Sequence, residues 1–251
     1  MEYKQIEYDH LDTLSFQELK DLAKSMDIPS CRSKDAYVEA IGGAFKEYDS
    51  HKRRTIGKYE VIEQMGGKDS MMYRVSRRGK EYAMKTFVKS KSSDKIRDEV
   101  EMQALAADAG VAPKVVEFDT LSKYIVMELM DCHLTSAMER QKEKNGPRIL
   151  KYQQLRIIDI FNRLDDAGIF HNDSNLANFM LSGRDVYMID FGFAKHVNER
   201  LIKKVGTERP NLRMMTISLI LKLKELKCDE YSYRYLMRQV SDDDQAKLNR
   251  H

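Results

Sequence analysis

The chain has 251 residues, 42% of them hydrophobic and 33% charged, with a formal net charge of +3. This composition allows a folded core, either one domain or a small module with a compact catalytic domain, and excludes wholesale disorder. No apolar run approaches the ~18 residues of a membrane span and the start of the chain is polar, so we expect neither a membrane segment nor a secretory signal.

The charge is unevenly distributed. Residues 1–50 hold 6 Lys/Arg and 11 Asp/Glu, a net charge of −5, whereas the remainder holds 37 and 29, a net charge of +8. This contrast predicts a small module over 1–48, a linker over 49–57 and a larger domain over 58–251. Three widely spaced cysteines suit no disulfide framework, so we expect a reducing compartment, the cytoplasm or the nucleus.

The front module is predicted to contain two short helices. Ser15 with Glu18 three residues later is typical of a helix start, and Phe16, Leu19 and Leu22 then follow at helical spacing. Pro29 ends this helix, because proline cannot continue it. Ser33 is expected to cap the second helix. The resulting core is very small, which favours docking on a larger domain.

The larger domain begins with a strand pattern. Three strands are predicted over 59–65, 72–75 and 81–87, with turns at Gly66-Gly67 and Arg78-Gly79. A helix is expected around 93–109 and a buried strand over 124–127. Leu155, Ile158, Phe161 and Leu164 indicate a core helix, and residues 178–189 form a clear hairpin. Helices fill the rest of the chain.

Oxygen-bearing residues surround this hairpin. Asp173 precedes it, Asn178 is its first residue, and Asp190 follows its second strand. Carboxylate and amide oxygens are the ligands that Mg²⁺ prefers, so Asn178 and Asp190 are candidate metal ligands. Asp173, on the loop before the hairpin, is placed to orient an attacking hydroxyl and take its proton.

A lysine in an apolar strand supplies the opposite charge. Lys85 needs either a counter-charge or a phosphate if it is buried, and Glu99 on the following helix is a natural partner. Glu101 is the alternative partner, because the phase of a helix is hard to fix to one residue from sequence.

The order of these motifs resembles that of the protein-kinase-like family over about residues 58–225. Tyr82-Ala83-Met84-Lys85 is similar to the strand that carries the family's lysine, His171 to Asn178 to its catalytic loop, and Asp190-Phe191-Gly192 matches at all three positions. The resemblance implies an α+β, bilobal fold with an N-lobe over about 58–127 and a trimmed helical C-lobe over about 131–251.

The resemblance also implies a site for ATP and Mg²⁺. Lys85, paired with Glu99, would hold phosphates, Asp173 would be the base, and Asn178 and Asp190 would bind magnesium. The remaining implied nucleotide-binding residues lie in the glycine turn and at the hinge between the lobes: Gly66, Gly67, Lys68, Ser70, Met127, Glu128 and Met130.

The chain departs from the family pattern at several places, among them the absence of an Ala-Pro-Glu motif after Gly192. The glycine turn has only two of the usual glycines, Asn172 replaces the arginine that receives an activation-loop phosphate, and Asn175 replaces a common lysine. The last feature resembles the RIO kinases and the small kinase of the tRNA-threonylcarbamoylation complex. The sequence is thus similar to an atypical, minimal kinase with a small platform for substrates.

Residues 12–46 resemble a SAP-type helix–extended–helix module. Such modules often bind DNA or chromatin, although the acidic balance here argues against tight phosphate contacts and favours protein docking or an internal role. Lys20, Lys24, Arg32 and Lys34 are the residues that would form a local basic face. The combination resembles proteins of large DNA viruses, which would place the chain in a viral factory or a virion.

Three functions follow from these expectations. The first is transfer of phosphate from ATP to Ser or Thr of a protein, with Asp173 as base. The second is a pseudokinase or scaffold that the front module recruits, although the presence of Lys85, Asp173, Asn178 and Asp190 together weighs against it. The third is a small-molecule phosphotransferase, favoured by the small platform and disfavoured by Phe191-Gly192.

Overall fold

The computed structural model describes residues 8–51, 54–67, 70–145 and 147–249. The chain divides into two compact units, residues 1–61 and 62–251, and each is described by itself. Lys52 and Arg53 of the expected linker, and Lys68 of the glycine turn, lie outside the described residues. No described helix combines the length and the apolar composition needed to cross a bilayer.

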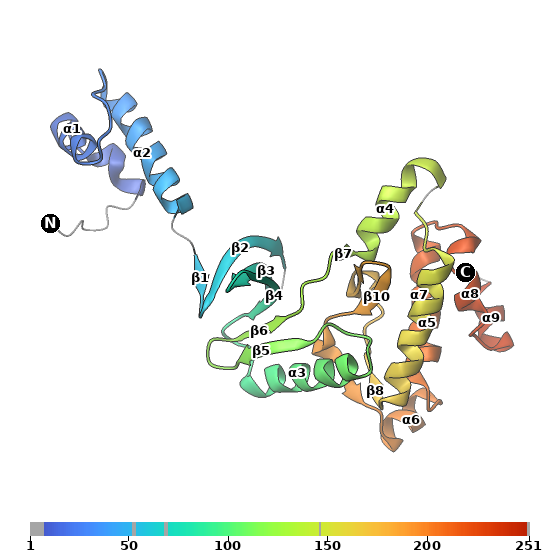
Figure 1. The fold of residues 1–251 in the computed structure, drawn as a ribbon. Coiled ribbons are helices and arrows are strands. Elements are labelled where there is room, and N and C mark those ends of the chain that lie inside the picture. Colours follow the sequence, from blue (N-terminus) through green and yellow to red (C-terminus); the bar gives the residue numbers. More distant parts are fainter. Residues whose placement is uncertain (1–7, 52–53, 68–69, 146, 250–251) are drawn as a thin grey trace. The chain divides into compact units, whose positions relative to one another are not determined.

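The first unit contains a turn of 3-10 helix and two α-helices. These are η1 (Tyr8–Thr13), α1 (Phe16–Ser25) and α2 (Lys34–His51), followed by strand β1 (Thr55–Ile56) (Figure 1). Helix α2 therefore extends into the segment that the sequence assigned to the linker. Leu11, Leu19, Ala23, Tyr37 and Ile41 form the core.

Helix α1 begins at a capping box. The Ser15 hydroxyl accepts a hydrogen bond from the Glu18 N–H, and the Glu18 carboxylate accepts one from the Ser15 N–H at 2.7 Å. This confirms the predicted helix start. Phe16, the first residue of the helix, is 45% exposed, and its ring packs at a steep angle against that of Tyr37 with the ring centres 5.5 Å apart. The core is too small to cover the first residue of the helix.

Loss of this cap should loosen α1 locally. We expect Ser15→Ala to lower the free energy of opening α1 by about 1 kcal/mol, because an N–H group at the helix start loses its acceptor. Hydrogen exchange of peptides spanning 16–25 in the full chain should then become about five-fold faster. Glu18→Gln keeps an acceptor for the Ser15 N–H and should change exchange less. Equal exchange in Ser15→Ala and the wild type would contradict the prediction.

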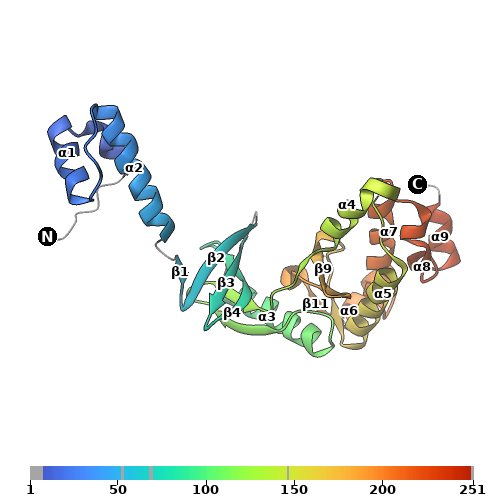
Figure 2. The ribbon, with the colours of Figure 1, turned by 45° about the horizontal axis from the view of Figure 1, so that its top comes forward.

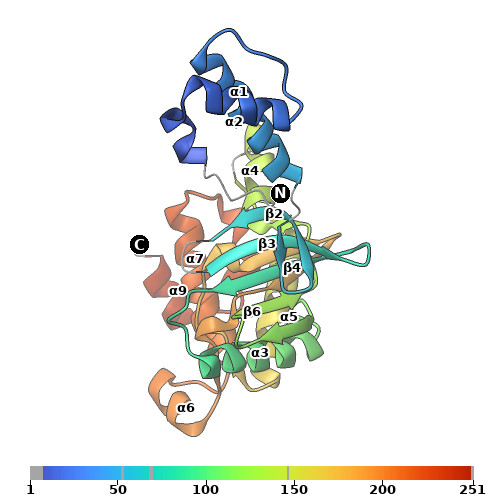
Figure 3. The ribbon, with the colours of Figure 1, turned by 90° about the vertical axis from the view of Figure 1, so that its left-hand side faces the viewer.

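The sheet is antiparallel and curled, with the strand order β1-β2-β3-β4-β6-β5. Figure 3 shows β2, β3, β4 and β6 side by side, with α3 below them. The remaining bounds are β2 (Tyr59–Gly66), β3 (Ser70–Arg77), β4 (Lys80–Phe87), β5 (Val115–Asp119) and β6 (Tyr124–Met127). The three predicted strands with their turns, and the buried strand β6, are confirmed; β1 and β5 were not predicted.

Helix α3 (Ser93–Asp108) packs against this sheet. Ser92 caps it by accepting a hydrogen bond from the Lys95 N–H, which confirms the predicted helix. Ile96 of α3 shares a cluster of buried residues with Ala83 of β4 and with Ile125 and Met127 of β6. The packing therefore fixes α3 against the strand that carries Lys85.

Helices dominate the rest of the second unit. They are α4 (Leu134–Asn145), α5 (Lys151–Asp166), α6 (Glu199–Val205), α7 (Thr216–Glu225), α8 (Arg234–Met237) and α9 (Asp242–Leu248). A π-helical segment, η4 (Asn211–Met215), leads into α7, and η5 (Glu230–Ser232) precedes α8. Figure 2 shows α7, α8 and α9 gathered beside α5. The α+β class predicted from the sequence is confirmed.

Short strands and turns complete the unit. They are β7 (Cys132–His133), β8 (Ile169–Phe170), η2 (Leu176–Asn178), β9 (Phe179–Ser182), β10 (Asp185–Met188), η3 (Phe191–Phe193) and β11 (Lys195–His196). The predicted hairpin is confirmed as β9 and β10, which pair from Asp185↔Ser182 to Met188↔Phe179.

The predicted core helix α5 is confirmed, with one error in its buried face. Ile158, Phe161 and Leu164 are buried, whereas Leu155 is 45% exposed. Gln154 takes the buried position instead, and its amide donates to the carbonyls of Ile149 and Tyr231. A buried amide with these partners satisfies its hydrogen bonds, so the core accepts it.

Candidate active site

Lys85 lies on β4, an inner strand of the sheet between β3 and β6. Its strand pairs Lys85 with Met72 on one side and with Ile125 on the other. The Lys85 ammonium lies 2.6 Å from Glu99 Oε1 and 2.7 Å from Asp190 Oδ1. Burial by itself would lower the pKa of Lys85, but these two carboxylates outweigh it and raise the pKa. Lys85 is therefore a buried cation at neutral pH.

Of the two partners that the sequence left open, Glu99 is the one in contact with Lys85. The side chain of Glu99 is 1% exposed, whereas Glu101 is exposed and its carboxylate lies 3.5 Å from His196 Nε2. A second lysine, Lys91, lies 2.6 Å from Glu99 Oε2. The sequence analysis missed Lys91, because its position in the loop between β4 and α3 follows no periodic pattern.

His171 joins the loop before the hairpin to the end of the hairpin. It is fully buried, and its two ring nitrogens each lie 3.0 Å from a backbone carbonyl, Nδ1 from that of Asp173 and Nε2 from that of Ile189. Burial lowers the pKa of His171 and outweighs the opposing effect of these carbonyls and nearby carboxylates. The ring thereby lies between the backbone of Asp173 and the strand that leads to Asp190, in contact with a carbonyl on each side.

Hydrogen bonds from Asn211 also hold the segment at His171 in place. The Asn211 side chain accepts a hydrogen bond from the His171 N–H, and its amide donates to the Ile169 carbonyl. Asp165 in turn accepts hydrogen bonds from the Asn211 amide and from the N–H groups of Asn211 and Leu212. Sequence reasoning missed both residues, because Asp165 lies in a predicted helix and Asn211 lies beyond the last motif, with no pattern that joins them.

Asp173, predicted as the base, and Asn178, predicted as a metal ligand, are in contact on this loop. Asn178 Nδ2 donates to Asp173 Oδ2 at 2.8 Å, and the Asn175 N–H donates to Asp173 Oδ1 at 3.1 Å. Both carboxylate oxygens of Asp173 are thus oriented by donors. The Asn178 carbonyl accepts from the Ile189 N–H at 2.9 Å, which fixes Asn178 at the root of the hairpin.

The backbone of the Asp190-Phe191-Gly192 turn adopts a conformation that few residue types tolerate. Asp190 adopts a left-handed conformation with φ of 66°, as does Asn172 with φ of 64°. Phe191 is buried with its ring 4.8 Å from that of His171. A Cβ on Gly192 would lie 3.2 Å from Glu99 Oε2 and 3.4 Å from Asp190 Oδ1, so a side chain here would crowd both carboxylates.

The carboxyl group of Asp190 is held in its charged form. Burial would raise the pKa of Asp190, but the Lys85 ammonium and the Gly192 N–H outweigh burial and hold the pKa below its usual value. These contacts stabilise the folded protein fully at a pH above the pKa of Asp190 in the unfolded chain, about 3.9. Their contribution is lost as the pH falls through the lower pKa that Asp190 has in the folded protein.

We therefore expect the Asp190→Asn variant to lose less stability than the wild type as the pH falls from about 5 toward 2. Urea unfolding followed by far-UV circular dichroism at several pH values measures this difference. An Asp108→Asn variant is the control, because Asp108 is exposed at the end of α3. Parallel curves for the wild type and Asp190→Asn would show that the ion pair with Lys85 contributes no pH-dependent stability.

The glycine turn joins β2 to β3. Gly66 and Gly67 have φ of 127° and 132°, which side chains rarely adopt. A Cβ on Gly67 would collide with the Ser70 carbonyl oxygen at 1.7 Å, so glycine is required there. Ser70 opens β3 and pairs with Phe87 of β4.

The predicted hinge follows β6. Met127 is buried and pairs with Ala83 of β4. The Glu128 N–H donates to the Lys114 carbonyl, and the Glu128 carboxylate accepts from the Lys114 N–H, both at 3.0 Å. The Met130 N–H makes no hydrogen bond to another residue in the described part of the chain.

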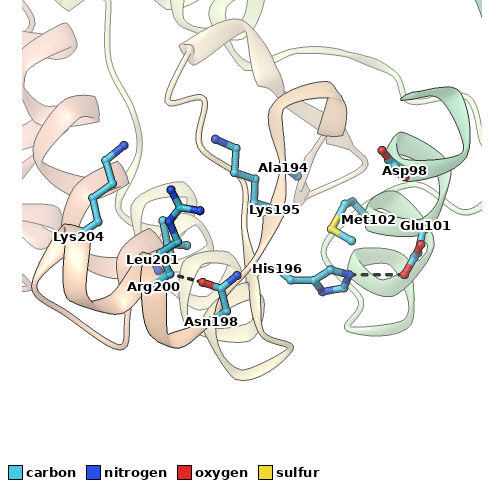
Figure 4. A pocket seen from close by; sticks show the side chains of 10 residues that line it. All are labelled: Asp98, Glu101, Met102, Ala194, Lys195, His196, Asn198, Arg200, Leu201 and Lys204. Carbon is cyan, nitrogen blue, oxygen red and sulfur yellow. Dashed lines mark hydrogen bonds and ion pairs between the residues drawn. The ribbon is translucent and has the colours of Figure 1, made fainter. Parts of the chain in front are cut away.

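Two clefts lie beside the residues of the candidate site. A cleft of about 660 Å³ separates α3 from the segment after Gly192, with Asp98 and Glu101 on the helix side and Lys195, Arg200 and Lys204 opposite (Figure 4). A second cleft, of about 450 Å³, adjoins Asp173 directly. Its lining is mainly polar and comes from the loop and from α7: Asp173, Ser174, Asn175, Ser218, Leu221, Lys222 and Glu225.

The chain is similar to protein kinases over most of its second unit. The family model of the protein kinase domain matches residues 59–210. A probable serine/threonine-protein kinase of Encephalitozoon cuniculi is 29% identical over 60% of this chain, and a putative one of Acanthamoeba polyphaga mimivirus is 24% identical over 60%. Serine/threonine-protein kinase MPS1 of Saccharomyces cerevisiae is 27% identical over 78% of this chain. The matches cover about 30% of each of these relatives.

Proposed function

Because the chain belongs to the protein kinase family, we propose that it transfers the γ-phosphate of ATP to Ser or Thr hydroxyls of a protein substrate. The observation that carries this proposal is the bridge that Lys85 forms between Glu99 and Asp190, since it presents a buried cation beside a carboxylate. The names of the relatives support Ser and Thr as acceptors.

The donor set suits magnesium. Mg²⁺ is commonly held by one or two carboxylates together with substrate phosphates, and Asp190 and Asn178 offer a carboxylate and an amide oxygen. A bound magnesium ion would neutralise the charge that develops on the transferred phosphoryl group. We propose Asp190 and Asn178 as its protein ligands.

Asp173 is the proposed base. Its two carboxylate oxygens are oriented by Asn178 and by the Asn175 N–H, and it borders the cleft that continues to α7. An acceptor hydroxyl in this cleft would donate its hydrogen bond to the carboxylate and release its proton there as its oxygen bonds to the γ-phosphorus of ATP. The bond from that phosphorus to the bridging oxygen would break in the same step, with ADP as the leaving group.

The remaining residues would position the nucleotide. We propose that Lys85 attracts the phosphates, that Gly66, Gly67 and Ser70 border them, and that the adenine edge meets the backbone of Glu128 and Met130. The Met130 N–H is available for that contact, since no other described residue accepts from it. Lys68, assigned to the phosphates from sequence, lies outside the described residues.

We further propose that the front module recruits a partner. A protein partner is the favoured candidate because residues 1–50 are acidic, while DNA or chromatin is the alternative. Lys20, Lys24 and Arg32 are exposed, and the Lys34 ammonium donates to the Asp12 carbonyl. We also propose a reducing compartment, the cytoplasm or the nucleus, because three widely spaced cysteines suit no disulfide framework, with a viral factory as the alternative because one relative is a mimivirus protein.

Transfer of labelled γ-phosphate tests the proposed function directly. The full chain is incubated with Mg-ATP and a generic basic protein, and label on protein is separated from free phosphate and from labelled small molecules. Label on Ser or Thr of the protein or of the chain itself is the expected result. A folded chain that labels only a small molecule, or labels nothing with magnesium or manganese, would overturn the proposal.

A further inference from the structure

The Glu99 carboxylate is shared by two lysines. Lys85 Nζ lies 2.6 Å from Oε1 and Lys91 Nζ lies 2.6 Å from Oε2, so each oxygen has its own ammonium group. The Glu99 side chain is 1% exposed, so water does little to stabilise its charge. The second ammonium is therefore a main part of the environment of this carboxylate.

The charges around Glu99 balance only when Lys91 is included. Lys85 and Lys91 are positive, whereas Glu99 and Asp190 are negative, and the printed contacts join all four. Without Lys91 the Lys85 ammonium would face two carboxylates alone. The two negative carboxylates would then offset most of the electrostatic attraction between Lys85 and a bound phosphate.

Two backbone hydrogen bonds and one aromatic contact hold Lys91 in this position. The Lys91 carbonyl accepts a hydrogen bond from the Lys123 ammonium at 2.8 Å, and the Lys91 N–H donates to the Val88 carbonyl at 3.1 Å. Its own ammonium lies 4.2 Å from the centre of the Phe87 ring, a favourable contact between a cation and an aromatic face. A group that is held in place beforehand loses little freedom when it acts.

We propose that Lys91 is a positioning residue of the phosphoryl-transfer site, which neutralises Glu99 so that the Lys85 charge remains available to the phosphates of ATP. This inference rests on the proposed function. Lys91 acts through Glu99 and Lys85, and its chemical role is to supply a second fixed positive charge.

The test compares three variants of the full chain. Lys91→Met removes the charge and keeps an apolar stem over Phe87, while Lys91→Arg keeps the charge. Lys89→Met is the matched control, because Lys89 is an exposed lysine two residues away whose side chain forms no ion pair among the described residues. For each variant we would measure kcat, the KM for ATP, the Kd for Mg-ATP and the thermal midpoint.

We expect Lys91→Met to raise both the KM and the Kd for ATP about ten-fold, and Lys91→Arg and Lys89→Met to stay within about two-fold of the wild type. A purely structural role would lower the active fraction, and hence kcat, with no change in KM or Kd. Such a pattern, or a Lys91→Arg variant as weak as Lys91→Met, would overturn the inference. Lys91→Gln replaces Lys91→Met if the latter does not fold.

Failure of the proposed function would look different. If the wild type binds Mg-ATP but transfers no phosphate, the proposed function fails while the Kd values still measure the role of Lys91. If the wild type binds no Mg-ATP at all, both proposals are overturned.

Discussion

Replacing Asp173 with asparagine is expected to lower kcat by about 10²–10⁴-fold, the range that a positioned general base contributes. The amide has the shape of the carboxylate, and its one oxygen can keep the hydrogen bond from the Asn175 N–H, while the contact with Asn178 is weakened. The Kd for Mg-ATP should change by less than about two-fold, because Asp173 is proposed to contact the acceptor and not the nucleotide.

Single-turnover transfer from labelled ATP, with the Kd measured separately, checks this expectation. Asp108→Asn is the control, since it makes the same chemical change at an exposed position of α3. A loss of kcat smaller than ten-fold in Asp173→Asn would mean that another group takes the proton. A parallel loss of ATP affinity would mean that Asp173 contributes to binding.

Replacing Lys85 with methionine is expected to lower kcat/KM by about 10²–10³-fold, as for other preorganised charged or hydrogen-bonding groups in catalytic sites. The thermal stability should change much less, because the buried Glu99 carboxylate keeps its contact with Lys91. Steady-state kinetics with ATP as the varied substrate, and a thermal melt, measure the two effects separately.

The double variant in which Lys85 and Lys91 are both methionine provides the contrast. It leaves Glu99 buried without a cation, which should cost about 3–5 kcal/mol of stability. If the Lys85→Met single variant already loses that much, Lys91 does not compensate for the missing charge, and the shared carboxylate has a different role from the one inferred here.

Local sequence rules were sufficient for the regular elements. Strands β2, β3 and β4 were predicted from alternating residues and from the turns at Gly66-Gly67 and Arg78-Gly79. Helix α1 was predicted from the capping pattern at Ser15. These signals work because turn geometry and helix capping depend on residues a few positions apart. The contact between Lys85 and Glu99 was predicted from their elements alone.

Contacts between distant segments could not be predicted in this way. Gln154 replaces Leu155 in the core because two carbonyls far apart in the sequence accept from its amide. Asn211 reaches His171 across forty positions, and only the folded chain shows that they meet. Lys91 lies in an irregular loop, where neither helical nor strand periodicity indicates which way a side chain points.

The left-handed backbone at Asn172 and Asp190 sets rules for substitution at these two positions. Asn and Asp tolerate this conformation far better than most residues with a side chain, and β-branched residues are true outliers there. A library that randomises position 172 should therefore return mainly Asn, Asp and Gly among folded clones, and exclude Val, Ile and Thr. Asparagine at position 172 therefore suits the conformation that the backbone adopts there.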